Sequence, residues 1–223
     1  MKSWISKTTI AIVMLIALPV LAHADNWALD PAHTKVEFTV RHMMISNVKG
    51  QFQKTSGTVT VNGSDPTSAK IDATIDATSI DTRVDKRDAH LKSPAFLDVD
   101  KFPTITFKSN KVEADGPGKW KVKGDLTLHG VTKPVVLEVE STGTPITDPM
   151  GNTRAGASAT TKISRKDFGL TWNQPLETGG VMVGDEVAIS MTSRRSRSSD
   201  YTCEIADAGG QVCSGGRAAA PLP

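Results

Sequence analysis

The sequence predicts an all-β protein, a single antiparallel barrel of eight strands with one short helix. Three observations carry this prediction. Polar and apolar residues alternate along many short segments, as they do in half-buried strands. Turn signals rich in Gly, Pro, Asn and Asp separate these segments, as at 62–64, 115–118 and 147–152. One internal segment, 81–97, lacks the alternation and is rich in charge.

The first 24 residues are predicted to be a cleavable secretory signal. Lys2 and Lys7 supply a positive start, an apolar run covers 10–21, and Ala22-His23-Ala24 is a small-x-small cleavage site. The alternative is a transmembrane anchor, but the run of about 12 residues is short of the roughly 20 that a span needs. We therefore expect a periplasmic protein whose mature chain begins at Asp25.

The mature chain is predicted to be electrically neutral. The sequence has 26 Lys and Arg residues, two of which leave with the signal, and the other 24 balance 24 Asp and Glu. Nucleic-acid binding requires a basic footprint, so this composition excludes a nucleic-acid partner.

Alternating segments between residues 35 and 191 predict the strands of the barrel domain. Their outer rows carry Lys, Glu, Thr, Asp and Arg, so one face of the sheet meets water. Short strands at this spacing are typical of a sandwich or a barrel, but a sandwich with added helices would show longer apolar runs. The segments are 35–41, 57–61, 71–77, 104–107, 120–123, 126–128, 135–140, 155–163 and 187–191.

The charged segment 81–97 predicts a short helix over roughly 85–92, ended by Pro94. Val84 and Leu91 are seven residues apart and would form its buried face. Arg87 and Asp88 flank that face, so a partly buried ion pair between them is expected to fix the helix against the barrel.

The alternation is lost from Ser193 onward, where Arg194 to Arg197 and a Gly- and Ala-rich end follow. We expect the barrel domain to cover 25–192 and residues 193–223 to form a disordered tail. Cys203 and Cys213 lie in this tail, where an oxidising compartment would allow them to pair.

The inner rows of the predicted strands mix large residues with small ones such as Ala73, Gly124 and Ala159. An eight-stranded barrel is either filled by side chains or holds one small ligand, and small inner residues favour the ligand. Each buried CH₂ contributes about 0.8 kcal/mol, so a long apolar chain needs polar contacts only at its head group. The predicted tunnel lining is Phe38, Val40, Met43, Met44, Phe52, Ile75, Phe107, Leu126, Leu128, Val139 and Ala157.

Seven segments in register between residues 27 and 191 carry a resemblance to a known family. The chain resembles the YceI-like periplasmic proteins, also called polyisoprenoid-binding proteins. The resemblance implies an extended, lipocalin-like barrel with a long internal tunnel that holds isoprenoid chains, including quinone-type molecules, or other amphiphiles. It implies no catalytic residues. The segments are 27–33 (WALDPAH), 36–44 (VEFTVRHMM), 48–52 (VKGQF), 85–91 (DKRDAHL), 102–107 (FPTITF), 124–134 (GDLTLHGVTKP) and 165–170 (RKDFGL).

The chain departs from the family pattern at its last strand. Alternation stops at Met191 and passes into the arginine-rich stretch, whereas family members continue it. This departure predicts a shortened last strand and puts closure of the barrel near 187–191 in question.

Polar residues next to the predicted strands and on the helix are candidates either for head-group contact or for a structural role. Arg41 and His42 follow a strand, and Met43, Met44 and Ile45 after them would plug the barrel end or form a flexible lid. The histidines and the Asp81, Asp85 and Asp88 series match no catalytic or metal-binding motif, so neither kind of site is predicted. The head-group or structural candidates are Arg41, His42, Arg87, Asp88 and His90.

The leading functional prediction is a periplasmic protein that carries or sequesters a long-chain isoprenoid lipid of the quinone type, or a similar amphiphile. This ligand would be bound non-covalently, and no covalent cofactor is expected. We also expect transient contact with a membrane, and a protein that is a monomer or a homodimer. Two alternatives stay open: a lipid-modifying enzyme that uses a His/Asp cluster, and a stress or interaction module without a ligand.

Overall fold

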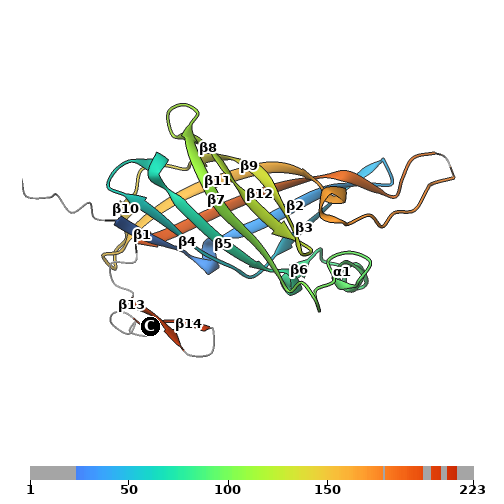
Figure 1. Ribbon diagram of the computed structural model, residues 1–223, viewed down its shortest axis with the longest axis horizontal. Helices are drawn as coiled ribbons and strands as arrows, with labels where there is room; N and C mark the ends of the chain where they lie inside the picture. Colours follow the sequence, from blue (N-terminus) through green and yellow to red (C-terminus); the bar gives the residue numbers. More distant parts are fainter. Residues whose placement is uncertain (1–23, 178, 198–201, 207–209, 215–223) are drawn as a thin grey trace, which may run out of the picture.

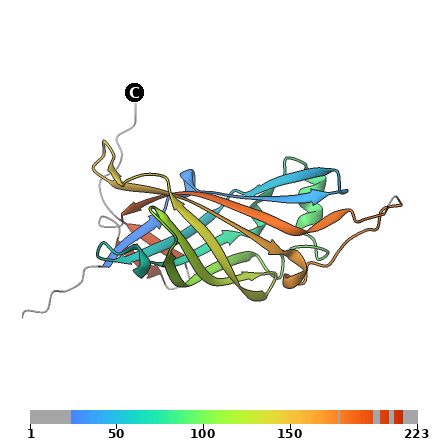
Figure 2. The ribbon, with the colours of Figure 1, turned by 90° about the horizontal axis from the view of Figure 1, so that it is seen from above.

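The computed structural model describes residues 24–177 and 179–197 and, for the backbone, 202–206 and 210–214. Most of the predicted signal and the rest of the predicted tail lie outside these ranges. Figures 1 and 2 show an elongated barrel with β1 and β10 near one end and helix α1 near the other. Among the described residues, no helix has the length and apolar character needed to cross a membrane.

Eight antiparallel chain segments close the barrel, and one α-helix accompanies them within the described residues, which confirms the predicted fold class. Two segments are bent: β1 continues through the 3-10 turn η1 into β2, and β3 continues into β4. The other six are single strands. In ring order the segments are β1 (Ala24–Leu29) with β2 (Lys35–His42), β3 (Ser46–Phe52) with β4 (Thr55–Asn62), β5 (Lys70–Asp76), β7 (Thr104–Ala114), β8 (Lys119–Leu128), β9 (Val131–Ser141), β11 (Thr153–Ser164) and β12 (Val183–Arg197).

Short elements complete the ends of the barrel. The 3-10 turns η1 (Pro31–His33), η2 (Pro66–Ser68) and η3 (Ala77–Ser79) each follow an aspartate whose side chain accepts a backbone N–H. Two short strands extend the sheet at its margins. Strand β6 (Ile80–Asp81) pairs with β3, and strand β10 (Ile146–Thr147) pairs with β11. Below, the helix end means α1 (Asp85–Lys92) with η4 (Arg165–Phe168), and the β1 end means β1, β10 and residues 193–197 of β12.

Strand β12 closes the barrel and corrects the predicted domain boundary. It pairs with β11 over residues 186–196, from Ser164↔Glu186 to Arg154↔Ser196. Its other edge pairs first with β2 and then, past Thr192, with β1. The predicted break at Met191 and the predicted start of the tail at 193 are therefore wrong, because the ladder consists of backbone hydrogen bonds and does not require apolar side chains.

The remaining part of the predicted tail contains a two-stranded hairpin of β13 (Thr202–Ala206) and β14 (Gly210–Ser214). Its register places Cys203 opposite Cys213. A disulfide between them stays a prediction.

The predicted helix is confirmed as α1, Asp85–Lys92. It ends at Ser93, whose N–H donates to the carbonyl of His90, directly before Pro94. Leu91 packs against the main core cluster, whereas Val84 is 45 % exposed, so its predicted burial is wrong. Val84 is the residue that precedes the first helical turn, in extended conformation, and its side chain therefore does not follow the buried face of the helix.

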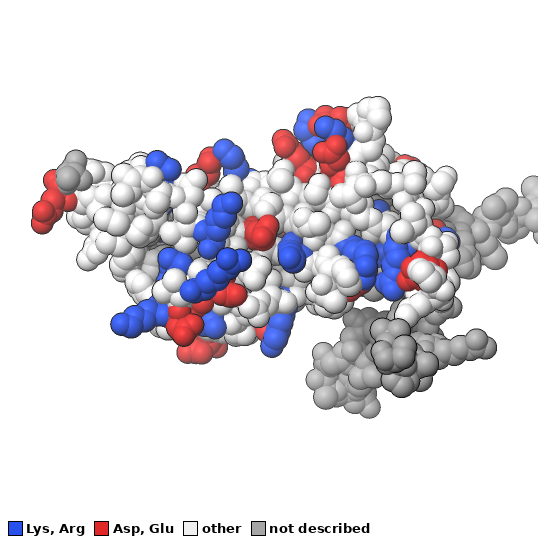
Figure 3. Space-filling view, turned by 180° about the vertical axis from the view of Figure 1, so that it is seen from behind, with Lys and Arg blue, Asp and Glu red and all other residues white. Residues whose placement is uncertain are grey.

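Two apolar clusters pack the interior of the barrel, and several of their residues also line the cavity described below. The larger lies at the helix end and includes Ile80, Leu128, Phe168 and Leu170, and the smaller consists of Phe107, Val112 and Val122. The outer face is polar: Figure 3 shows Lys and Arg interspersed with Asp and Glu over the visible surface. The division agrees with the predicted alternation of inner and outer rows.

Candidate ligand-binding cavity

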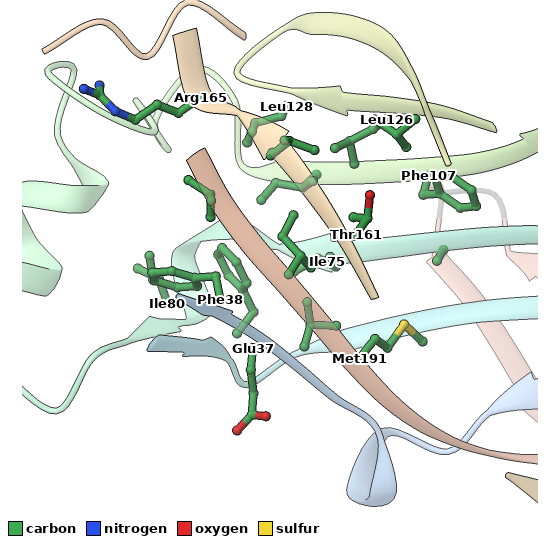
Figure 4. A pocket seen from close by; sticks show the side chains of 18 of the residues that line it. Glu37, Phe38, Ile75, Ile80, Phe107, Leu126, Leu128, Thr161, Arg165 and Met191 are labelled. Carbon is green, nitrogen blue, oxygen red and sulfur yellow. The ribbon is translucent and has the colours of Figure 1, made fainter. Parts of the chain in front are cut away.

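An apolar cavity of about 230 Å³ lies inside the barrel, between strands from all sides of the ring. Its wall consists mainly of Leu, Ile, Val, Phe and Ala side chains, with Thr55, Thr160 and Thr161 among them and Met191 at the margin toward the β1 end (Figure 4). Two charged residues, Glu37 and Arg165, belong to the wall, but Figure 4 shows their charged groups pointing away from the enclosed space. The cavity therefore offers hydrocarbon surface to a guest.

The size of the cavity sets the length of chain that it accepts without rearrangement. An engineered cavity of about 150 Å³ with a similar lining stays dry and binds benzene. By the same measure the cavity holds roughly nine carbon atoms. A longer isoprenoid would displace flexible side chains such as Met191 or extend toward an end of the barrel.

Seven of the eleven predicted lining residues line the cavity, so the inner rows were assigned to the correct face of the sheet. The alternation also runs through Ile105, Val187 and Ile189, which line the cavity and are not among the predicted residues. Phe96, Leu97 and Leu170 line it from loops at the helix end, where no period marks them. The seven are Phe38, Val40, Phe52, Ile75, Phe107, Leu126 and Leu128.

The other four predicted lining residues lie elsewhere. Met43 and Met44 are 42 % and 50 % exposed in the β2–β3 turn, where both have positive φ. Val139 packs against the smaller core cluster, and Ala157 is buried without reaching the cavity. Alternation assigns a side chain to the inner face but does not tell whether the bore is open at that depth.

Small inner residues leave space in some places and not in others. Ala73 and Ala159 line the cavity. At Gly124, by contrast, an added Cβ would lie 2.6 Å from the ring of Phe107. The aromatic ring has taken the space that glycine leaves, so part of the predicted volume is filled by protein.

Arg41 and His42 have the surroundings of turn residues and not of a head-group site. The guanidinium of Arg41 donates to the carbonyl of Met44 at 2.8 Å and to Oδ1 of Asn47 at 3.3 Å, which ties the two strands of the turn together. His42 pairs with Ser46 and Val183 in the sheet. Neither belongs to the cavity wall.

Arg87, Asp88 and His90 attach α1 to the helix end. The predicted Arg87–Asp88 ion pair is absent from the described residues, because both side chains bind buried Thr82 instead. Arg87 Nε donates to Thr82 Oγ1 at 2.7 Å, and Asp88 Oδ1 accepts the N–H of Thr82 at 2.9 Å. His90 lies edge-on to Phe96 and Trp172, with ring centroids 5.0 Å away in each case.

Arg165 braces the helix end. It is 3 % exposed, and its guanidinium donates to the carbonyls of Trp172 at 2.9 Å and Gly184 at 2.9 Å, and also to that of Leu170. It donates further to Val183 O and to Asp185 Oδ1 at 3.2 Å. Burial lowers the pKa of Arg165, and the charge of Asp185 opposes that effect. Every donor direction of the guanidinium is therefore used within the fold.

The candidate catalytic residues do not come together. Asp30 lies 3.2 Å from His33 at the β1 end, whereas His129 contacts the carbonyl of Phe168, also at 3.2 Å, at the helix end. Asp81 accepts hydrogen bonds from Gln53 and from the N–H of Arg83. No three His, Cys, Asp or Glu side chains of the described residues are close enough to share a metal ion.

Comparisons with known proteins agree with this architecture. The YceI-like domain family matches residues 27–194. A UPF0312 protein of Vibrio cholerae is 38 % identical over 168 residues, which are 74 % of this chain and 88 % of the relative. A UPF0312 protein of Staphylococcus aureus is 40 % identical over 162 residues, 73 % of this chain and 92 % of that protein.

Solved structures show the same barrel. The YCEI protein of Campylobacter jejuni is 31 % identical, with a TM-score of 0.60, and the match covers 70 % of this chain and 88 % of that one. BcnA of Burkholderia cenocepacia matches in fold, with 23 % identity and a TM-score of 0.65 over 74 % of this chain and 98 % of that one. A polyisoprenoid binding domain from Saccharophagus degradans also shares the fold, with 16 % identity and a TM-score of 0.55 over 77 % of this chain and 98 % of that one. The chain belongs to the YceI-like family.

Proposed function

We propose that this protein binds a long-chain isoprenoid lipid, of the quinone type or a similar amphiphile, in the cavity of its barrel. The apolar cavity is the observation that carries the proposal, because it has no charged group facing inward to bind a polar substrate. A structural relative from Saccharophagus degradans is described as a polyisoprenoid binding domain, which supports the same class of ligand.

A cavity-filling substitution tests where the ligand binds. Leu126→Trp places an indole in the cavity wall, and we expect it to weaken binding of farnesol by at least 10-fold. Val136→Trp is the matched control, because Val136 is exposed on the neighbouring strand β9. Equal affinities of both variants and the unchanged chain, measured by titration calorimetry, would place the ligand outside the barrel. Organic extraction of protein from its native source, followed by mass spectrometry, would identify the lipid.

We further propose that the protein is a binder and not an enzyme. The separated histidines support this, because the His90 ring packs against two aromatic rings and, among the described residues, makes no hydrogen bond or ion pair with an acid or a base. His90→Ala should lower the melting temperature. Neither this variant nor the unchanged chain should modify farnesol. Turnover of a lipid that disappears in a stably folded His90→Ala variant would support the enzyme instead.

We propose that the protein acts in the periplasm as a carrier or store for this lipid. The signal-like pattern of residues 1–24 supports export. Expression of the full chain, and of a chain that lacks residues 2–24, should place only the former in the periplasmic fraction. Appearance of both chains in the cytoplasm would contradict the proposal.

Transient membrane contact is proposed because exposed apolar side chains occur at both ends of the barrel. Met44 and Ile45 lie at the β2–β3 turn, and Ile146 and Met150 lie at the β1 end. Flotation with lipid vesicles identifies the end that touches the bilayer. One double variant carries Met44→Ser with Ile45→Ser, and the other carries Ile146→Ser with Met150→Ser. Unchanged flotation of both proteins would contradict the contact.

A further inference from the structure

An arginine at the β1 end points into the barrel. Along β12, Val187, Ile189 and Met191 line the cavity, and alternation continues the same inner row through Ser193 to Arg195. Arg195 lies opposite Ala155 on β11 and Leu29 on β1, both of which are buried. The small side chain of Ala155 leaves space for the guanidinium inside the sheet.

Arg195 has no polar partner among the described residues. Its Nε is buried and makes no hydrogen bond, and the side chain takes part in no ion pair with them. Its sequence neighbours differ: Arg194 donates to Asp30 at 2.6 Å, and Arg197 pairs with Asp25. Burial alone lowers the pKa of Arg195, with no carboxylate to oppose it.

The contact that Arg195 does make leaves its donors free. The guanidinium lies 5.6 Å from the centroid of the Trp27 ring, over its face. A cation–π contact stabilises the charge of the guanidinium. The N–H groups point outward in the plane of the guanidinium, and the face of the ring does not accept hydrogen bonds from them. The stacking fixes the position of the cation at the β1 end of the inner row of β12.

Two threonine hydroxyl groups on the inner rows between Arg195 and the middle of the barrel are also buried without a hydrogen-bond partner among the described residues. Thr55 lines the cavity, and Thr34 lies two residues before Val36, on the same inner row. Their buried Oγ1 atoms and Arg195 Nε are the buried side-chain polar atoms of the described residues that lack a partner. Buried polar atoms without partners are rare in folded proteins, and three on one inner surface call for a polar partner such as water, an ion or a ligand head group.

We infer that Arg195 binds the anionic head group of an amphiphile, a phosphate or a carboxylate, whose tail lies in the apolar cavity. This inference rests on the proposed function and specifies its ligand class. Arginine suits either anion, because its planar N–H groups match two oxygens at once. The Thr34 and Thr55 hydroxyls donate to the head group or to the atoms that join it to the tail.

The geometry also orients the ligand. With its head at Arg195, the tail points toward the helix end, where Phe96, Leu97 and Leu170 form the apolar limit of the cavity. Among the inward charges at the β1 end, Arg197 and Asp25 neutralise each other, so Arg195 leaves one positive charge that a monoanion balances. The head group then lies at the end that carries Ile146 and Met150.

Head-group selectivity tests the inference. The delipidated full-length protein is titrated with farnesyl phosphate and dodecanoate, and with the neutral alcohols farnesol and dodecanol. Arg195→Met keeps similar volume and removes the charge, and should weaken binding of the anions by about 10- to 100-fold while it changes binding of the alcohols little. Arg194→Met is the matched control, since Arg194 is paired with Asp30 on the outside, and should preserve the preference for anions.

Each outcome separates the two proposals. Equal losses for anions and alcohols in Arg195→Met, or no loss for either, overturn the inference. Failure of the unchanged protein to bind any of the four amphiphiles overturns the proposed function instead. Arg195→Lys retains the charge and should recover part of the preference for anions, which a merely space-filling arginine would not require. A loss for farnesyl phosphate but not for dodecanoate assigns the site to phosphate.

Discussion

The two ends of the barrel each hold an arginine that is wholly or partly buried, and the surroundings satisfy it in opposite ways. At the helix end, Arg165 is buried and all its donors are bound by backbone carbonyls and Asp185. At the β1 end, Arg195 stacks on Trp27 and its Nε has no partner among the described residues. A saturated guanidinium is a brace within the fold, whereas an unsaturated one still requires a polar partner, which we infer to be the ligand head group.

Backbone geometry explains the difference. The register between β12 and β2 shifts between Val183 and Val187, which frees the carbonyls of Val183 and Gly184 for Arg165. The loop after η4 adds the carbonyls of Leu170 and Trp172. Arg195, by contrast, lies where β12 is paired on both edges, with β11 and β1. Carbonyls in an unbroken ladder are already used, so none turns inward.

The largest expected effect separates the two arginines by stability. Arg165→Met leaves several buried carbonyls without a donor and should lower the free energy of unfolding by about 3–5 kcal/mol. Arg195→Met removes a charge that has no polar partner among the described residues, and should change the free energy of unfolding by less than about 1 kcal/mol. Urea unfolding of both variants measures the difference. Equal destabilisation would abolish the distinction between brace and binding site.

A smaller effect is expected where α1 joins the helix end. Thr82→Val removes the hydroxyl that Arg87 and Asp88 share, and should cost about 1–3 kcal/mol of unfolding free energy. Thr104→Val is the control, because Thr104 is exposed on β7. If Arg87 and Asp88 served a head group instead, Thr82→Val would alter the affinity for anionic amphiphiles and leave urea unfolding unchanged.

The pH dependence of the β1 end sharpens the comparison between its outer and inner charges. Backbone hydrogen bonds from Asn152, together with Arg154, lower the pKa of Asp148 to about 2 from its ordinary value of 3.8. Because the folded-state pKa is depressed, Asp148 stabilises the fold above pH 3.8 and loses that contribution as the pH falls through about 2. An NMR titration of the carboxyl group measures the midpoint.

The matching variant is Asp148→Asn. It should remove this part of the acid dependence of unfolding and leave the affinity for farnesyl phosphate at neutral pH unchanged, since Asp148 lies outside the bore beside Arg154. A midpoint near 3.8, or a change in affinity, would show that outer and inner charges are not separate.

The smallest effect is expected at the β2–β3 turn. Met44→Ser changes an exposed side chain outside the cavity and should alter the free energy of unfolding by no more than about 0.5 kcal/mol. Leu128→Ala, in the cavity wall at the helix end, should cost about 2–5 kcal/mol. A large loss in Met44→Ser would restore the interpretation of this turn as a plug of the barrel.

Much of the fold follows from local signals. The period of two marked the strands and placed residues such as Phe38 and Leu126 on the inner face. Charge content and Pro94 marked the helix, whose bounds agree with α1. Alternation places Val139 and Ala157 on the correct face but does not give their depth, because the pattern is the same in an open and in a filled stretch of the barrel.

The partners of polar side chains were less accessible to sequence reasoning. Arg87 and Asp88 were expected to pair with each other, but Thr82, which no motif singled out, binds both. Arg165 stood within a family motif, and the backbone carbonyls that surround it come from residues up to 19 positions away. No periodicity reports such contacts.

By itself, the sequence determined the alternation of the strands, the helix, the apolar inner rows and the family, since each of these is set by residues close together in the chain. Only the tertiary structure decided where the bore stays open and how far β12 extends. The arginines after Met191 read as the end of a strand because alternation was lost there. Closure of the barrel supplies β1 and β11 as pairing partners, and thereby turns Arg195 from a tail residue into an inward-facing cation.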